Sequence, residues 1–548
     1  MSLPKSTTEV PLTEITEAVN QDEERCPSLE RRRLIDELVK KLDLPQGYTG
    51  LLNIDPMLLG EVKEFVLNNL SKHTNLDASD IVFRVIDIYC VRLYGLFFHS
   101  SKSHVIVSHW HHTGLGISRR LAEYLTPHVS DALPFDSYDD TIIIDDHLLQ
   151  KPTYLLEAPP SLVIKERIIS LLKRVPASKA PATSISPIRA LTGDRIVPSS
   201  STNDVYLFPT GTAAQYRFHQ YLSNSNYHEY SSVAFGKVSR GVLDILRRNG
   251  NRDKHFPQGD DKDLLNLEEF CKSEAAADRR VQALYAEFPS ASSLISARLE
   301  NLRKLADKYE FVFVISDLFG SFANVDIMAT ADVLLTSLTG SFSGYTDVTG
   351  GSLVLNADSR AAYRKLKPLM QRSWHNELFA GDAVVLANNS HNYLHRSAIL
   401  NQNAESVASF LQSKVHDSKT SVMKVNYPKF SEARSSHEMY MRDQTGRLDP
   451  GYGWFLTLDL AGADHAVAFY ESLRGRFGVH VNTGVVYVAL CDETEFEYPY
   501  EKGTEDQGRG GNRICIVIGM ENIDELVDSF KQALDVADTI KTANKLAI

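Results

Sequence analysis

The segment VYLFPTGTAAQYRFHQYL, residues 205–222, decides the fold, because a short apolar strand runs through a glycine turn into a helix. The same order recurs after the apolar segments SSVAFG (231–236), LYAEF (284–288) and FVFVIS (311–316), with stretches of helical periodicity between them. Strands and helices that alternate in this way form a mostly parallel sheet whose faces are covered by the helices. We therefore predict an α/β large domain at residues 201–415.

The sequence on either side of this domain has a different texture. Residues 1–200 contain a polar arm, the helical segment LERRRLIDELVKKLDL and a closing stretch rich in Pro, Ser and Thr. We expect an N-terminal extension there that also contacts a second subunit. After residue 415, the strands GWFLTLDL and RICIVIGM and the helix NIDELVDSFKQALDVADTI predict a smaller α+β domain at 416–548.

The bulk composition excludes several classes of protein. With 548 residues, 43% hydrophobic and 23% charged, the chain is ordinary globular protein and longer than one core usually organises. A net charge of −12 without a basic stripe argues against nucleic-acid binding. The sequence contains no signal-peptide core and no membrane span, so we expect a cytoplasmic protein that does not bind membranes. The five cysteines contain no CxxC pair, and we expect reduced thiols.

Several segments resemble the fungal branch of the cystathionine gamma-synthase (Cys/Met metabolism) family, which are fold-type I enzymes that work through pyridoxal phosphate. They include HTGLGISRRLAEYL, YLFPTGTAAQYRFHQYL, LYAEFPSAS, ADVLLTSLTGSFSGYTDVTGGSLVLN and NRICIVIGMENIDEL. Their order and spacing over residues 110–530 are not expected by chance. The resemblance implies a fold of the PLP-transferase type for the predicted sheet and its flanking helices.

The resemblance also implies a phosphate-binding cup. Gly211 and Thr212, in PTGTAAQ, match the glycine turn whose N–H groups and positive helix end hold the phosphate. Ser337 and Thr339 match two hydroxyls that bind the phosphate just before the family's lysine. An alternative reading needs no ligand, because small residues also let a helix pack closely against a sheet.

The positions that hold the cofactor ring differ from the family pattern. The lysine of the family's SLTK is Gly340 here, so no Schiff base can form at this position. The aspartate of the family's VDE, which pairs with the pyridine nitrogen, is Ser316, and Asp317 beside it should point to the opposite face of the strand. The asparagine of EFPSNP is Ala291. Phe235 matches the position that stacks on the ring, although a phenylalanine after a strand is more often core.

Basic residues suggest the substrate side of the site. Arg513, in NRICIVIGMEN, matches the arginine that grips the substrate α-carboxylate in the family. Arg120 in GISRRLAEY, with Arg119 as the alternative, matches an arginine that reaches the phosphate of a neighbouring subunit, although the tyrosine of that motif is absent. We therefore expect a homo-oligomer, a dimer or tetramer. Lys237 and Arg240 either add positive charge to the pocket or are solvated loop charges.

The run of His109, Trp110, His111 and His112 could be taken for a metal site. Neighbouring side chains of an extended segment point to alternate faces, and no carboxylate is close in the sequence. We therefore expect no metal.

These losses predict a PLP-independent member of the family, with binding of the cofactor lost or non-covalent. We expect the old cleft to bind a carboxylate-bearing small molecule. If the protein is catalytic, a cyclisation, condensation or elimination in fungal specialised metabolism fits, although fold does not fix function. Two alternatives stay open: a non-catalytic paralogue that assembles with an active family member, and a PLP-dependent gamma-replacement or C–S lyase enzyme.

Overall fold

A computed structural model of the chain describes most of its residues. The described ranges are 29–55, 81–89, 91–103, 113–134, 155–173, 199–224, 230–248, 253–290, 294–295, 297–317, 319–345, 347–443, 448–477, 487–491 and 512–546. Among them, no helix is both long and apolar enough to cross a membrane.

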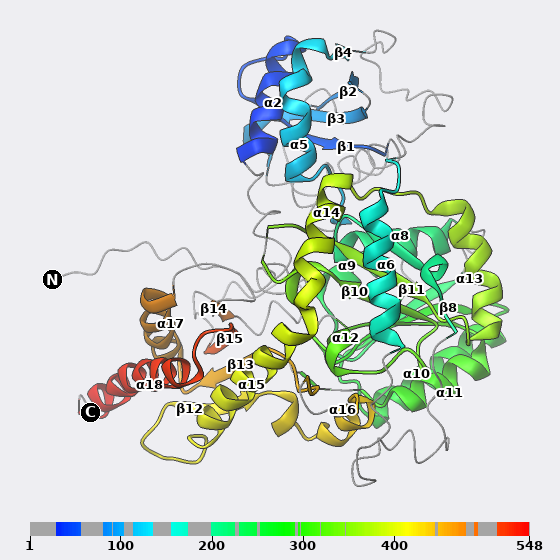
Figure 1. Ribbon diagram of the computed structural model, residues 1–548. Helices are drawn as coiled ribbons and strands as arrows, with labels where there is room; N and C mark the ends of the chain where they lie inside the picture. Colours follow the sequence, from blue (N-terminus) through cyan, green and yellow to red (C-terminus); the bar gives the residue numbers. More distant parts are fainter. Residues whose placement is uncertain are drawn as a thin grey trace.

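A seven-stranded sheet in the order β5-β11-β10-β9-β8-β6-β7 forms the centre of the molecule (Figure 1). Its strands are β5 (Val205–Phe208), β6 (Ser231–Phe235), β7 (Lys254–Phe256), β8 (Val281–Glu287), β9 (Val312–Ser316), β10 (Val333–Ser337) and β11 (Gly351–Leu355). Neighbours from β7 to β10 pair in parallel, and β11 runs antiparallel to both β10 and β5. The mostly parallel sheet confirms the predicted fold class.

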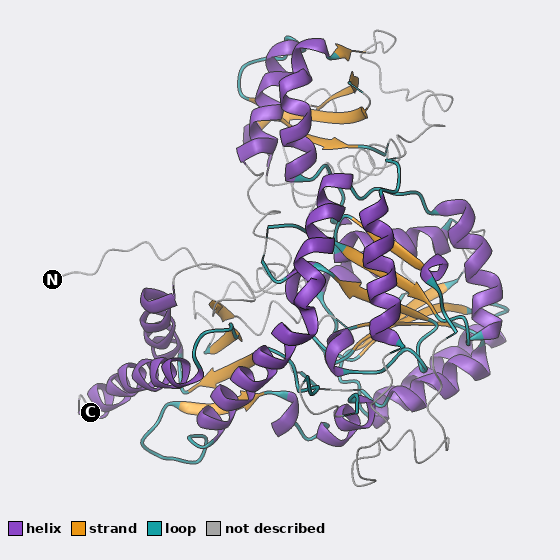
Figure 2. Cartoon of the chain, in the orientation of Figure 1, coloured by secondary structure: helices purple, strands orange, loops and turns teal. Residues whose placement is uncertain are grey.

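Helices cover both faces of this sheet (Figure 2). The α8 face is the one packed against α8 (Gly211–Ser223), α9 (Arg240–Arg248) and α13 (Arg360–Ser373). The α6 face is the one packed against α6 (Pro159–Leu172), α10 (Asp261–Ala276), α11 (Leu299–Tyr309), α12 (Ser321–Asn324) and α14 (Ala380–Asn389). Residues 159–172 therefore belong to the core of the large domain, although the predicted boundary at residue 200 placed them in the N-terminal extension.

A smaller antiparallel sheet in the order β1-β3-β2-β4 lies at the N-terminal end, at the top of Figure 1. Its strands are β1 (Tyr48–Asn53), β2 (Ile81–Ile88), β3 (Val91–His99) and β4 (Leu133–Pro134). Helices α2 (Leu29–Lys41) and α5 (Arg119–Leu125) share a hydrophobic core with it. The helix α2 confirms the prediction made from LERRRLIDELVKKLDL.

A third sheet in the order β12-β13-β15-β14 forms the C-terminal part. Its strands are β12 (Val422–Asn426), β13 (Phe455–Leu460), β14 (Tyr487–Cys491) and β15 (Arg513–Val517), and the helices are α15 (Tyr393–Gln412), α16 (Arg434–Tyr440), α17 (Ala463–Phe477) and α18 (Ile523–Leu546). Cys515, on β15, is disulfide-bonded, which corrects the expectation that the thiols are reduced.

One buried arginine joins the N-terminal sheet to the large domain. Arg217, on α8, is 1% exposed, and its Nη2 atom lies 2.5 Å from Asp55 Oδ2 and 2.5 Å from Glu377 Oε1. Asp55 follows β1 and Glu377 precedes α14. Asp55, Glu377 and His375 could together hold a metal ion by their spacing, but the Arg217 guanidinium already supplies the positive charge between the two carboxylates. We assign no metal to this cluster.

Replacement of Arg217 by Met should lower the free energy of unfolding by about 3–5 kcal/mol, because two carboxylates would stay buried without their cation. Urea unfolding followed by circular dichroism measures this change. Arg298→Met is the control, because Arg298 and its partner Asp261 are 61% and 72% exposed and such a pair contributes about 1 kcal/mol or less. Equal losses of unfolding free energy in Arg217→Met and Arg298→Met would contradict the stabilising role assigned to Arg217.

Candidate functional site

Three polar side chains lie together where the parallel strands end. Glu287 on β8 is the register partner of Ser316 on β9, and Ser316 is the register partner of Leu335, two residues before Ser337 on β10. Leu335 packs in the core of the α8 face. Because side chains alternate along a strand, Glu287, Ser316 and Ser337 lie on this same face.

The N-terminus of α8 approaches the end of β10 closely. A Cβ atom added at Gly211 would lie 3.0 Å from Ser337 Cβ, so the two residues are in contact. Thr210, the residue before Gly211, lies against Gly351: a Cβ atom added at Gly351 would lie 2.1 Å from the carbonyl oxygen of Thr210. Only a glycine at position 351 allows this approach, which brings the two halves of the predicted phosphate cup together.

The first turn of α8 keeps backbone donors available. Thr210 caps the helix, because its Oγ1 accepts the Ala213 N–H at 2.9 Å. The N–H groups of Gly211 and Thr212 have no acceptor among the residues that the structure describes, and both residues are partly exposed. Such N–H groups at the positive end of a helix bind anions.

Gly340 lies in a tight turn of π-helical type, Thr339–Ser343, directly after β10. Gly340 is buried and brings no side chain into this position. Thr339 is 4% exposed, and its Oγ1 accepts the Gly350 N–H at 3.1 Å. We use the name strand-end site for seven residues that these contacts and the strand register bring together: Gly211, Thr212, Glu287, Ser316, Ser337, Thr339 and Gly340.

Glu287 is a member that the sequence analysis missed. It is 5% exposed, and its Oε1 accepts the Ser239 N–H at 2.8 Å. The available signal was a charged residue at the end of the buried strand LYAEF, since a buried carboxylate needs a reason to be there.

Asp317 points away from the site, as predicted from the alternation of strand side chains. It is 1% exposed, and its Oδ1 accepts a hydrogen bond from Thr336 Oγ1 at 2.5 Å. Thr336 lies between Leu335 and Ser337 and therefore faces the α6 side of the sheet. Burial raises the pKa of Asp317 to about 8.

Phe235 does not line the strand-end site. It is 3% exposed and packs in the core of the α6 face, opposite the face of Glu287 and Ser316. This placement corrects the stacking assignment and favours the core alternative. Ala291 and residues 109–112 lie outside the described part of the chain.

Two arginines assigned to ligands have protein partners instead. Arg513 makes both bonds of its fork to Asp459 on the neighbouring strand, with Nε–Oδ1 and Nη2–Oδ2 distances of 2.5 and 2.8 Å. The two parallel bonds that we expected for a substrate carboxylate therefore go to this residue. Arg120 lies 3.3 Å from Asp382 and 3.6 Å from Asp347 of the same chain, and its assignment to a phosphate of a neighbouring subunit stays a prediction. The homo-oligomer stays a prediction.

The segment at residues 113–118 contacts the cup within this chain. Thr210 Oγ1 donates to the carbonyl oxygen of Gly114 at 2.9 Å. Gly114 has a φ of +60°, and a Cβ atom there would lie 2.7 Å from Thr212 Cβ. The backbone of the N-terminal region thus forms a wall beside the first turn of α8.

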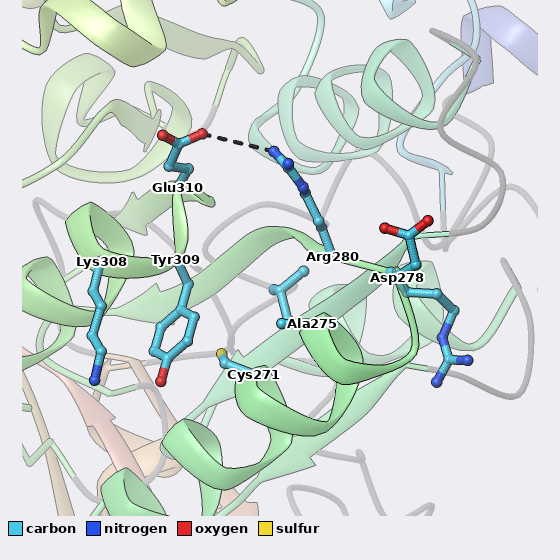
Figure 3. A pocket seen from close by; sticks show the side chains of 9 residues that line it. Cys271, Ala275, Asp278, Arg280, Lys308, Tyr309 and Glu310 are labelled. Atoms are coloured by element: carbon cyan, nitrogen blue, oxygen red, sulfur yellow. Dashed lines mark ion pairs between the residues drawn. The ribbon is translucent and has the colours of Figure 1, made fainter.

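A cavity of about 340 Å³ lies where β8 begins, at the end of this strand opposite to the strand-end site (Figure 3). Its cationic side chains already have acidic partners: Arg279 pairs with Glu274, Arg280 with Glu310, and Lys308 with Glu268. The remaining lining residues are Cys271, Ala275, Asp278, Val281 and Tyr309. This cavity therefore offers no excess charge to a ligand, and we assign no function to it.

Replacement of Asp317 by Asn should flatten the dependence of stability on pH. The ordinary carboxyl pKa is about 3.9, so the unfolded chain loses this proton at a lower pH than the folded chain, whose pKa is about 8. The free energy of unfolding of the natural protein should thus fall as pH rises between these values. The free energy of unfolding of the variant, relative to that of the natural protein, should rise by a few kcal/mol across the same pH range. Urea unfolding at several pH values measures the difference, and a constant difference would contradict the prediction.

Comparison with known proteins agrees with the sequence and the fold. A sequence profile of the family described as "Cys/Met metabolism PLP-dependent enzyme" matches residues 184–535. The cystathionine gamma-synthase-like enzyme iboG1 of Amanita muscaria is 31% identical over 462 residues, which cover 78% of this chain and 74% of that protein. Cystathionine gamma-synthase of Neurospora crassa is 31% identical over 389 residues, which cover 69% of this chain and 59% of that protein.

A solved structure shows the likeness of fold. Cystathionine gamma synthase from Xanthomonas oryzae pv. oryzae, in complex with cystathionine, superposes with a TM-score of 0.50 at 16% identity and covers 70% of this chain and 100% of that one. The profile match and the fungal relatives confirm the predicted family: the chain belongs to the Cys/Met metabolism PLP-dependent enzymes and is similar to the fungal cystathionine gamma-synthase-like branch.

Proposed function

We propose that this protein is a PLP-independent member of its family, and that the strand-end site binds an anionic small molecule bearing a carboxylate or a phosphate. The observation that carries the proposal is the buried glycine at position 340, where the resemblance expects the lysine that binds the cofactor. Without an amine at this position the family's covalent link cannot form.

The residues present fit only one part of pyridoxal phosphate. The N–H groups of Gly211 and Thr212 and the hydroxyls of Ser337 and Thr339 suit a phosphate, and the contact between Gly211 and Ser337 brings them together. The ring has no comparable support, because Ser316 stands where the resemblance to the family expects the aspartate that holds the pyridine proton. A hydroxyl cannot replace a carboxylate in that role. We therefore derive no chemical step through this cofactor.

The same residues suit an anionic ligand of another kind. Carboxylate and phosphate oxygens accept the same backbone N–H and hydroxyl donors, so the cup can hold either group. Because Arg513 is engaged with Asp459, we assign the anionic end of the ligand to the cup rather than to Arg513. This corrects the substrate side of the prediction without changing the class of ligand.

Glu287 and Ser316 give the site a means of moving protons. The Glu287 carboxyl group lies on the same face as the Ser316 hydroxyl and in register with it. A buried carboxyl group can take up or release a proton, and a hydroxyl beside it can orient a reacting group. These groups suit a cyclisation, condensation or elimination that needs no electron sink, in a protein that has fungal relatives.

The purified protein should be colourless above the protein absorption band, because Gly340 offers no amine to the cofactor. Borohydride reduction followed by peptide mass spectrometry should find no pyridoxyl-lysine. Native mass spectrometry of the same preparation would identify a bound anion. A yellow protein that yields a labelled lysine would overturn the proposal. Activity that is found only when the protein is in a complex with an active relative would favour the alternative of a non-catalytic paralogue.

Gly340→Lys alone should restore cofactor binding only weakly, because Ser316 still leaves the pyridine nitrogen without an anionic partner. Adding Ser316→Asp should strengthen binding more than the two single changes predict, because both groups act on one ring. Absorbance titration with pyridoxal phosphate measures this. Full binding by Gly340→Lys alone would show that Ser316 is not at the aspartate position, and Ser316→Asp alone serves as the matched control.

A further inference from the structure

Arg396 is a buried cation directly behind the turn that carries Gly340. It lies on α15 and is 2% exposed. Its Nη2 donates to three successive carbonyl oxygens of that turn, those of Ser341, Phe342 and Ser343, at 3.1, 2.8 and 2.8 Å. Its Nη1 donates to Asn389 O at 2.7 Å and to the side-chain oxygen of Asn392.

All of these acceptors are neutral. Among the residues that the structure describes, no carboxylate lies within ion-pair distance of Arg396, and its Nε atom is buried without a hydrogen-bond partner. The guanidinium also lies over the ring of Tyr345, whose centroid is 5.2 Å from Cζ. An arginine stays charged even when buried, so a full positive charge lies here without a balancing anion.

The turn connects this charge to the strand-end site. Arg396 donates to the carbonyl oxygens of Ser341, Phe342 and Ser343, and the same turn begins at Thr339 and Gly340 of the strand-end site. The backbone of Gly340 is not helical, with φ −68° and ψ −106°, so Arg396 acts on the site through its charge and not through an aligned helix dipole.

We propose that Arg396 is a positioning residue for anion binding: it fixes the turn Thr339–Ser343 by its carbonyls and supplies the positive charge that an anion in the strand-end site balances. This inference rests on the proposed anion-binding function. Gly344 supports the arrangement, because a Cβ atom there would lie 2.6 Å from Arg396 Nε and would push the guanidinium out of the turn.

The test measures the affinity of inorganic phosphate and of acetate for the full-length protein and its variants. The thermal shift at a series of anion concentrations gives the affinity of each folded variant. Arg396→Gln removes the charge, Arg396→Lys keeps the charge but not the planar fork, and Asn392→Ala removes one neutral acceptor. Arg442→Gln is the matched control, because Arg442 is 5% exposed but lies 3.7 Å from the carboxylate of Asp326.

Arg396→Gln should weaken the binding of both anions by roughly tenfold, since a unit charge at this range has that effect in a partly buried site. Arg396→Lys should recover at least half of the loss on a logarithmic scale, and Asn392→Ala and Arg442→Gln should change affinity less than about twofold. If the natural protein binds neither anion, the proposed function fails. If it binds them and Arg396→Gln, or Arg396→Met where Gln does not fold, binds phosphate as well as Arg442→Gln does, the role of Arg396 fails alone. If Arg396→Gln weakens the binding of phosphate but not that of acetate, the anionic group of the natural ligand is a phosphate and not a carboxylate.

Discussion

The close approach of Gly211 to Ser337 is the constraint on which the rest of the site depends. The first turn of α8 passes over β11 only because position 351 has no side chain, since a Cβ atom there would lie 2.1 Å from the Thr210 carbonyl oxygen. This approach directs the positive end of α8 toward the ends of β9 and β10. Backbone donors from α8 and the hydroxyl of Ser337 on β10 are thereby brought close together, which neither element could offer alone.

Much of this arrangement could be predicted from the sequence because it follows from periodicity. The alternation of strands and helices between residues 205 and 316 predicts the central sheet, and the two-residue period of a strand predicts that Ser316 and Asp317 face opposite sides. The same period would have placed Phe235 correctly, but only with the registers of β6 with β8 and of β8 with β9. Register is set by pairing across the sheet, and a single segment does not contain it.

The ion pairs could not be predicted for a related reason. Arg513 and Asp459 are 54 residues apart in the sequence, and Arg120 and Asp382 are 262 apart. A family motif identifies an arginine and its usual ligand, but the partner in a given chain depends on which acidic residue the fold brings beside it. Glu287 was missed in the opposite way, because the motif EFPSNP drew attention to its asparagine and not to the carboxylate at the strand end.

The substitutions at positions 340 and 316 are electrostatically linked. Relative to the family pattern, Lys to Gly removes a positive group and Asp to Ser removes a negative one, so the pair leaves the net charge of the site unchanged. Glu287 is the register partner of position 316 and is 5% exposed. An aspartate kept at 316 without the lysine or the cofactor would lie beside Glu287 as a second buried carboxylate, and like charges at that separation oppose ionisation of both. Without the lysine or the cofactor, a neutral residue at position 316 avoids this pair of buried carboxylates. If position 340 is the family's lysine position, as we propose, the absence of the ring's anionic partner therefore accompanies the absence of the lysine, and Glu287 is the carboxylate that stays beside position 316.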